Sequence, residues 1–173
     1  RLKTLLKEIR SSAFTGEITL GIMRYAAEVA SRGVLLVLRK DGIVGFGQFG
    51  VDVGTESADE RVRKIKIPLT EPSIFTKIVK DRETYRGKIG PAKWNDYFQE
   101  QLGGIKPDEA VLIPMTVAGK VVVIFYGDDA GTGKPLGDVD GLEILMSQAS
   151  LAMERSILEK KIEALEQAHP QPS

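Results

Sequence analysis

Two pairs of apolar runs, each joined by a two-residue turn, constrain the fold of this sequence more than any other feature. Residues 34–38 form a continuous apolar run, residues 43–49 follow as a second, largely apolar run, and Asp41-Gly42 lies between them. Residues 110–126 repeat this arrangement around Ala118-Gly119. Both residues of an Asp-Gly pair tolerate a positive φ, which makes the pair a strong signal for a hairpin turn. The sequence therefore predicts two antiparallel hairpins.

Apolar residues at helical spacing mark both ends of the chain. They predict a short helix over 2–9 and a second helix over 15–31, with Gly33 as the C-terminal cap of the second. A long helix is expected from about 137 to about 167, with Asp138 accepting backbone N–H groups at its start. The hairpins are therefore flanked by helices on both sides in the sequence.

The middle of the chain alternates between short elements. Residues 51–60 are rich in acidic and small residues and predict a surface loop, and the alternation over 62–67 predicts a half-buried strand with a basic outer face. A helix is expected to begin at 70–72, a short strand to cover 85–89, and a further helix to cover 91–102. The resulting order of elements predicts an α+β fold, with helices packed on a central antiparallel sheet.

Charge and composition exclude several classes of protein. The 24 basic and 24 acidic residues cancel, which argues against binding to nucleic acid. No apolar run approaches the roughly 20 residues needed to cross a bilayer, so no membrane association is expected. The absence of cysteine excludes thiol chemistry and favours a location in the cytoplasm. The start at Arg1, without methionine or a signal peptide, predicts a segment of a longer protein.

The layout resembles a GAF domain, a sensor module related to PAS. The resemblance is strongest in the hairpin around Gly119-Lys120 and in the closing helix that contains 142–149, and it is supported by the first hairpin. It implies a sheet with a pocket on one side and dimer-forming helices on the other. It also implies a regulatory domain of a bacterial signalling protein, in the subset attached to receiver or other signalling modules. Neighbouring signalling domains are then expected as partners.

The known activities of GAF domains can be compared with these residues. Bilin attachment and the reduction of free methionine sulfoxide both depend on cysteine, which this chain lacks. The only histidine, His169, lies in the tail and makes a poor axial ligand for haem. The cyclic-nucleotide motif is also missing. We therefore expect no cofactor and no metal, and either a small molecule of unidentified kind or no ligand.

Three motifs resemble binding signatures, but their spacing or the elements around them do not match those signatures. Residues 45–50 match the dinucleotide pattern G-x-G-x-x-G, but they lie in a predicted strand and no helix follows them. Their glycines are better explained by a bulge or by close contact with another backbone segment. Residues 131–135 are only half of a phosphate loop, and the nearby aspartates lack the spacing of an EF-hand. Because no nucleophile and base can be paired, the sequence predicts a protein that is not an enzyme.

Aromatic residues are concentrated in the segment that covers the pocket of a GAF domain. Tyr and Trp combine a flat apolar face with one polar group, which suits a small-molecule site. The alternative is that these side chains only fill the core between sheet and helices. The candidate pocket residues are Phe46, Gln48, Phe75, Tyr85, Trp94, Tyr97 and Met115.

The last helix carries a second apolar stripe in addition to the one that faces the domain. Apolar residues recur every seven positions from Ile144 onward, which is typical of a seam between helices, although Gln148 and Arg155 interrupt it. The N-terminal helix can join the same bundle. The sequence predicts a homodimer, with an interface that includes Leu5, Ile9, Leu151, Leu158, Ile162 and Leu165.

These inferences divide the chain into three parts and leave two functions open. Residues 1–14 are expected to form a linking helix, residues 15–156 the GAF-like domain, and residues 157–173 a helical extension and tail. The first function is a sensory or regulatory module that dimerises through its terminal helices. The alternative is a protein-interaction or scaffold domain whose own side chains fill the pocket.

Overall fold

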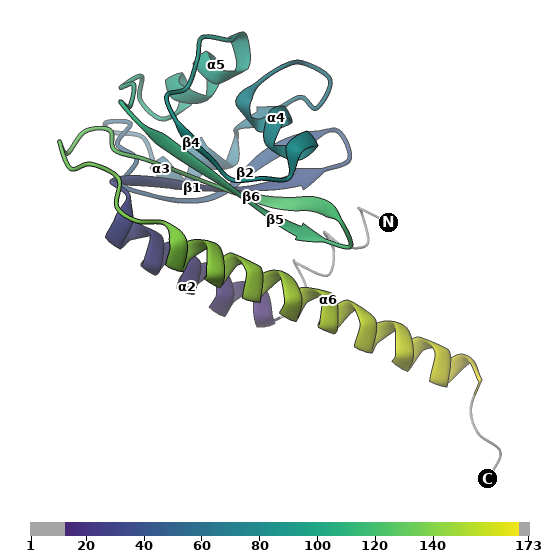
Figure 1. Cartoon of the computed structure of the whole chain (residues 1–173). Helices are drawn as coiled ribbons and strands as arrows, with labels where there is room; N and C mark the ends of the chain where they lie inside the picture. Colours follow the sequence, from purple (N-terminus) through teal and green to yellow (C-terminus); the bar gives the residue numbers. More distant parts are fainter. Residues whose placement is uncertain (1–12, 170–173) are drawn as a thin grey trace.

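The computed structural model of the protein describes residues 13–169. The predicted helix over 2–9, with Leu5 and Ile9, lies outside the described residues. With the labels of Figure 1, the elements in chain order are α2 (Ala13–Val29), β1 (Arg32–Arg39), β2 (Gly42–Phe49), α3 (Ala58–Arg63), β3 (Lys66–Ile67), α4 (Ile74–Asp81), β4 (Tyr85–Gly87), α5 (Lys93–Gln101), β5 (Ala110–Val117), β6 (Lys120–Asp128) and α6 (Asp140–Ala168).

The strands form one six-stranded antiparallel sheet in the order β3-β2-β1-β6-β5-β4. Both predicted hairpins are confirmed: β1 pairs with β2 around Asp41, and β5 pairs with β6 around Ala118 and Gly119, both of which have a positive φ. The hairpins join where β1 pairs with β6 at the centre of the sheet. The expected α+β fold with an antiparallel sheet is therefore correct.

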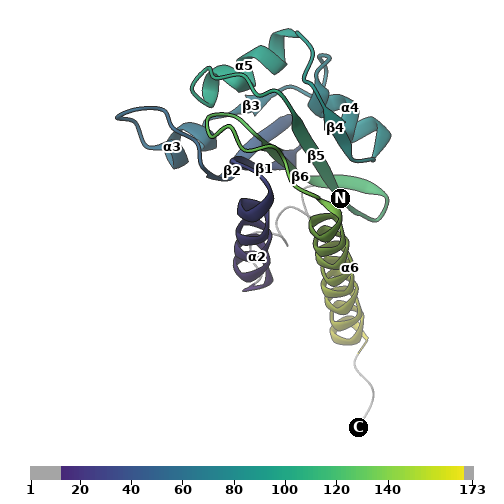
Figure 2. The ribbon, with the colours of Figure 1, turned by 60° about the vertical axis from the view of Figure 1, so that its left-hand side comes forward.

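Helices cover both faces of the sheet (Figures 1 and 2). On one face, α2 and the first half of α6 lie side by side and pack Ile22, Ala26, Leu142 and Met146 onto the strands. On the other face, α3, α4 and α5 form a second apolar layer, which we call the α4/α5 layer. The far half of α6 runs past the edge of the sheet, and its residues from Leu158 to His169 are all exposed.

The strand predicted over 62–67 is wrong in its first half. Residues 58–63 form α3, whose N-cap Ser57 accepts a hydrogen bond from the backbone N–H of Glu60, and only Lys66–Ile67 forms a strand. Val62 and Ile65 are both fully buried, and a spacing of three places both on one face of a helical turn. Ile65 and Ile67 do alternate as in a strand, which explains why the whole stretch resembled one.

Two predicted helix caps also differ from the structure. Gly33 lies inside β1, and α2 already ends at Val29. Glycine is required at this position for another reason, because a Cβ on Gly33 would stand 2.0 Å from Cε2 of Phe49. The N-cap of α6 is Val139, one residue after the predicted Asp138. Asp138 does accept a backbone N–H at the start of the helix as predicted, from Asp140 at 2.9 Å. The helix predicted to begin at 70–72 begins later, at Ile74, after a capping box between Ser73 and Thr76.

The glycines of residues 45–50 serve the sheet, as the alternative explanation predicted. A Cβ on Gly45 would stand 1.9 Å from the carbonyl oxygen of Val62, so only glycine lets α3 approach β2 this closely. The register between β1 and β2 shifts between Leu35 and Leu36, which leaves Phe46 without a partner in a β-bulge. No helix begins directly after Gly50, because residues 50–57 form a loop before α3, so this segment lacks the strand-to-helix turn of the dinucleotide motif.

Candidate functional site

Three aromatic side chains fill the centre of the α4/α5 layer. Phe75 from α4, Phe98 from α5 and Tyr126 from β6 are all fully buried. The ring centroids of Phe75 and Phe98 are 4.7 Å apart, and those of Phe98 and Tyr126 are also 4.7 Å apart, both in edge-to-face arrangements. The chain's own side chains therefore occupy the middle of the space between the sheet and these helices.

A buried ion pair lies beside this aromatic cluster. Arg32, the first residue of β1, and Asp128, the last residue of β6, are 4% and 0% exposed. The guanidinium donates from Nε to Oδ1 at 2.9 Å and from Nη2 to Oδ2 at 2.7 Å. This bidentate geometry is the strongest arrangement of an arginine with a carboxylate, and its hydrogen bonds offset the free-energy cost of removing both charges from water.

The remaining polar atoms around the ion pair are also satisfied. Arg32 donates to the carbonyl oxygens of Leu102 and Ile105 and to Oε1 of Gln99, at distances of 3.2, 3.1 and 3.2 Å. The hydroxyl of Tyr126 donates to Oδ2 of Asp128 at 2.6 Å and accepts from Nε2 of Gln99 at 2.8 Å. We call Arg32, Asp128, Tyr126 and Gln99 the polar network.

The charges of this network displace two pKa values. Burial alone would lower the pKa of Arg32, but the hydrogen bonds and the negative charge of Asp128 outweigh burial, and the pKa is raised. Burial raises the pKa of the Tyr126 hydroxyl well above its usual value, and the neighbouring carboxylate of Asp128 adds to this effect. Arg32 therefore stays charged and Tyr126 stays protonated at neutral pH.

The polar network connects three elements that lie far apart in the sequence. Gln99 belongs to α5, Arg32 begins the strand that follows α2, and Asp128 ends the strand that leads toward α6. The backbone N–H of Ser31 also donates to the carbonyl oxygen of Asp128 at 2.8 Å. The network therefore ties the α4/α5 layer to the two central strands at the points where the chain leaves α2 and turns toward α6.

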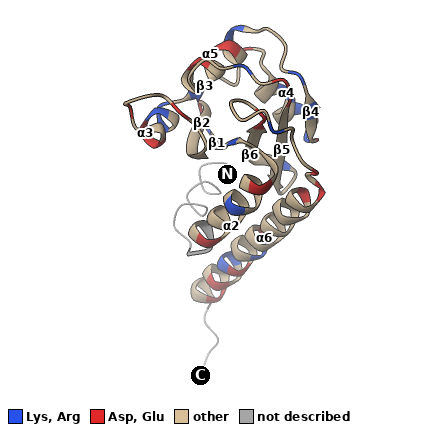
Figure 3. Ribbon diagram, turned by 90° about the vertical axis from the view of Figure 1, so that its left-hand side faces the viewer, with Lys and Arg blue, Asp and Glu red and all other residues tan. Residues whose placement is uncertain are grey.

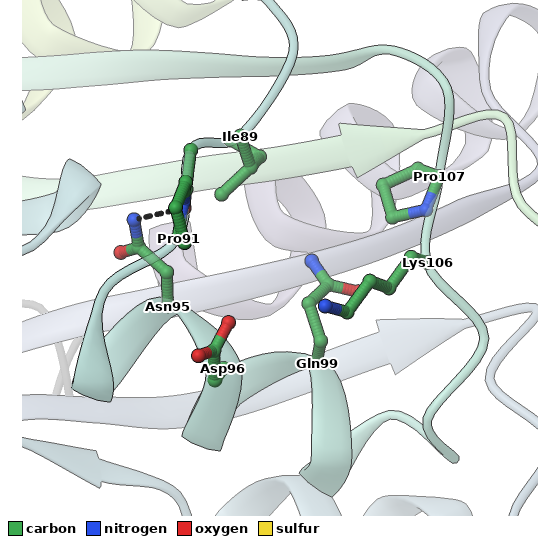
Figure 4. Close-up of a pocket in the computed structure, with 8 residues that line it drawn as sticks. Ile89, Pro91, Asn95, Asp96, Gln99, Lys106 and Pro107 are labelled. Carbon is green, nitrogen blue, oxygen red and sulfur yellow. Dashed lines mark hydrogen bonds between the residues drawn. The ribbon is translucent and has the colours of Figure 1, made fainter.

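A small cavity borders the polar network (Figure 4). Its volume is about 150 Å³. Asn95, Asp96 and Gln99 project into this region from α5, while Lys106 and Pro107 line it from the segment before β5. Ile89, Gly90 and Pro91, after β4, complete the lining. Gln99 is therefore shared between the cavity and the network.

A second hollow lies on the surface along α4. It is more open, with a volume of about 690 Å³, and it is lined by Leu69, Pro72, Ser73, Thr76, Lys77, Val79, Lys80 and Asp81. Its lining comes from one helix and the segment before it. It therefore lacks groups that converge from several elements, which is the usual mark of a ligand site.

The structure brings together four of the seven candidate pocket residues. Phe75, Tyr85, Trp94 and Tyr97 all belong to the apolar cluster of the α4/α5 layer. Trp94 packs against Tyr97 with ring centroids 5.1 Å apart, and its buried Nε1 has no hydrogen-bond partner among the described residues. None of these four lines the small cavity.

The other three candidates lie elsewhere. Met115 is on the opposite face of the sheet, in the core with α2 and α6, so it does not share a site with Trp94. Phe46 is the exposed bulge residue of β2. Gln48 donates to Asp59 at 2.7 Å and accepts from the N–H of Val51 at 3.1 Å, which holds the segment before α3. Sequence analysis also missed Arg32, Asp128 and Gln99, for which no local motif exists.

The part of the chain that the structure describes offers no metal centre and no membrane span. Within residues 13–169, no three His, Cys, Asp or Glu side chains lie close enough to hold a metal ion. No helix in the same range is both long and apolar enough to cross a membrane.

The apolar stripe of α6 faces solvent. Ile144, Leu151, Leu158 and Leu165 are 60%, 66%, 59% and 63% exposed, and Ile162 is 46% exposed. On the far half of the helix they lie among mixed acidic and basic residues (Figure 3). Large apolar side chains aligned on one exposed face are characteristic of an interaction surface. We call Ile144, Leu151, Leu158, Ile162 and Leu165 the α6 seam.

Comparison with known proteins identifies solved structures that share this fold. No protein-family model and no curated protein matches the sequence. The GAF domain/HD domain protein from Geobacter sulfurreducens is similar over 91% of this chain and 99% of that one, with a TM-score of 0.63 and 12% identity. The blue-light absorbing form of the PixJ GAF domain from Thermosynechococcus elongatus is similar over 90% and 94%, with a TM-score of 0.68 and 14% identity. The GAF domain of a two-component sensor histidine kinase from Bacillus halodurans is similar over 86% and 97%, with a TM-score of 0.54 and 13% identity.

Proposed function

We propose that this chain, whose fold is that of GAF domains, is a non-catalytic sensory or regulatory module of a bacterial signalling protein that dimerises through α6. The observation that carries this proposal is the α6 seam, which exposes apolar side chains along a helix that runs past its own sheet. The similarity to GAF domains of signalling proteins supports the regulatory assignment. Neighbouring domains of the full-length protein would receive the output through this helix.

A second copy of the chain is the partner that best fits the α6 seam. The apolar residues recur every seven positions from Ile144 to Leu165, which keeps them on one side of a helix that pairs with another. The first half of α6 also lies beside α2, where Leu20 and Tyr25 are exposed. Two copies can therefore form a bundle in which both helices of each protomer take part.

The polar network offers a route from the α4/α5 layer to this bundle. A ligand or partner that binds one arrangement of α5 more tightly than another shifts the balance between the two arrangements. Gln99 of α5 is hydrogen-bonded to Arg32, and Arg32 is paired with Asp128. A shift of α5 would therefore reach the ends of the strands that connect to α2 and α6.

The double substitution Leu158→Asp with Leu165→Asp tests the dimer. Both residues are exposed and lie beyond the sheet, so the substitutions place charge in the seam without disturbing the core. We expect sedimentation to show monomers with unchanged circular dichroism from the sheet. The matched control is Ala164→Asp with Gln167→Asp, which adds the same charges to exposed positions on the other side of the helix and should leave the dimer intact. Equal sedimentation of both double variants and the parent would refute dimerisation through α6.

One observation favours the alternative of a scaffold domain without a ligand. Phe75, Phe98 and Tyr126 fill the centre of the α4/α5 layer, so the chain's own side chains occupy that space. A chain of this kind would be regulated by a protein partner alone. If no small molecule raises its melting temperature, the scaffold function is the better description.

A further inference from the structure

We infer that the cavity between α5 and the segment before β5 binds a small zwitterion, an α-amino acid with a short side chain. This inference rests on the proposed sensory function and names the chemical class of its signal. It depends on three properties of the cavity: two unlike charges at its mouth, two amides in its wall and its size.

The two charged groups at the cavity are unlike and unpaired. Asp96 lies on α5 and Lys106 lies on the segment before β5, and both are exposed. Within the described residues, neither side chain has a hydrogen-bond or ion-pair partner, and the two do not bond to each other. The cavity therefore presents one free cation to a carboxylate and one free anion to an ammonium group.

The wall of the cavity supplies hydrogen-bond donors that are already fixed in place. Asn95 and Gln99 are 7% and 5% exposed. Asn95 donates from Nδ2 to the carbonyl oxygen of Gly90 at 3.1 Å, and Gln99 donates from Nε2 to Tyr126 at 2.8 Å. Each amide nitrogen carries two N–H groups, so one N–H on each is left without a partner in the described part of the chain. Amides held in this way can bind a ligand without further loss of side-chain freedom.

The size of the cavity limits the ligand. At about 150 Å³ it lies well below the roughly 300–1,000 Å³ of sites for drug-sized molecules. A nucleotide or a tetrapyrrole is therefore too large. A molecule with one carboxylate, one ammonium group and a short apolar side chain matches both the charges and the space, and Ile89 and Pro107 offer apolar surface for that side chain.

Binding at this cavity acts directly on the polar network. Gln99 lines the cavity, donates to Tyr126 and accepts from Arg32. A ligand that bonds to the free N–H of Gln99 favours the orientation of α5 in which that amide faces the cavity. The occupied site would then be coupled to the strand ends through one side chain.

The test is a calorimetric titration of the full chain with L-alanine and glycine. Propionate and ethylamine are the matched controls, since each carries only one of the two charges. We expect saturable binding of the amino acids and affinities lower by about tenfold or more for each control, the effect of losing one charged hydrogen bond. The assignment of a zwitterion would be overturned if propionate or ethylamine bound as tightly as alanine. It would also be overturned if neither alanine nor glycine bound.

Variants locate the site. Lys106→Met and Asp96→Asn should each weaken the binding of alanine by about tenfold or more. The matched controls Lys88→Met and Glu100→Gln alter exposed residues that do not line the cavity, and they should leave the affinity unchanged. Equal affinity in all four variants would overturn the location. Sedimentation of the parent chain separates this test from the proposed function, because a parent that binds neither amino acid but still forms the dimer refutes only the ligand class.

Discussion

Substitution of Asp128 by asparagine removes the negative charge at the centre of the polar network and leaves Arg32 buried. Asp128 accepts from Nε and Nη2 of Arg32, from the hydroxyl of Tyr126 and from the N–H of Ala130. Removal of one partner from a fully buried pair costs about 3–5 kcal/mol, because the other charge is left without compensation. We expect the free energy of unfolding to fall by that amount.

Urea unfolding followed by circular dichroism measures this change. For a small protein the free energy of unfolding changes by about 1–3 kcal/mol per molar urea, so the midpoint should fall by more than about 1 M. Arg32→Lys keeps the charge but loses the two-pronged contact with Asp128, and we expect a smaller loss. The double variant Arg32→Met with Asp128→Leu removes both charges and should be more stable than Asp128→Asn.

The outcome that contradicts this reasoning is a small effect of the single substitution. A loss below about 1 kcal/mol is the value of an exposed ion pair. Such a result would mean that water reaches Arg32 and that the network is not sealed. It would also remove the physical basis for coupling α5 to the strand ends, because a solvated arginine does not force its neighbours to move together.

Two further predictions concern Tyr126 and Gly45. Burial and the charge of Asp128 raise the pKa of Tyr126 in the folded protein, so the stability that this group contributes is present below its usual pKa of 10.0 and is lost as the pH rises above it. In urea titrations above about pH 10, the free energy of unfolding should therefore fall more steeply in the parent than in Tyr126→Phe. The difference should reach up to about 1.4 kcal/mol per pH unit. Gly45→Ala places a Cβ 1.9 Å from the carbonyl oxygen of Val62 and should lower the free energy of unfolding by about 1–3 kcal/mol. The control is Gly47→Ala, whose Cβ meets nothing within 4 Å and which should leave the free energy of unfolding unchanged. Equal losses in the two variants would refute the close contact between α3 and β2.

The parts of the fold that were predicted correctly are those encoded locally. The turn at Asp41-Gly42 and the apolar runs around it specify a hairpin without help from the rest of the chain. The prediction of a strand over 62–67 was wrong in its first half because two patterns overlap there. Val62 and Ile65 are spaced as in a helix, and Ile65 and Ile67 are spaced as in a strand. Ser57 and Glu60, which begin α3 with a side-chain cap, were the signal that could have separated them.

The candidate site was only partly predictable because it depends on which face of the sheet a residue occupies. In β5, residues on both faces are buried, so the apolar run gives no alternation from which the side of Met115 could be inferred. The aromatic residues of α4 and α5 were identified because they lie close together in the sequence. Arg32 and Asp128 are separated by 96 positions, and only the pairing of β1 with β6 brings them together.

The position of the polar network bears on the regulatory function that we propose. The α4/α5 layer and the pair α2 and α6 lie on opposite faces of the sheet, so a change on one face reaches the other through the strands or around their ends. The strands β1 and β6 are neighbours at the centre of the sheet, and a buried core of this kind resists gradual deformation. Arg32 and Asp128 lie at the ends of these strands, in contact with α5 through Gln99. A transition that exchanges the partners of Gln99 therefore has a direct mechanical path to α2 and α6 without any rearrangement of the sheet itself.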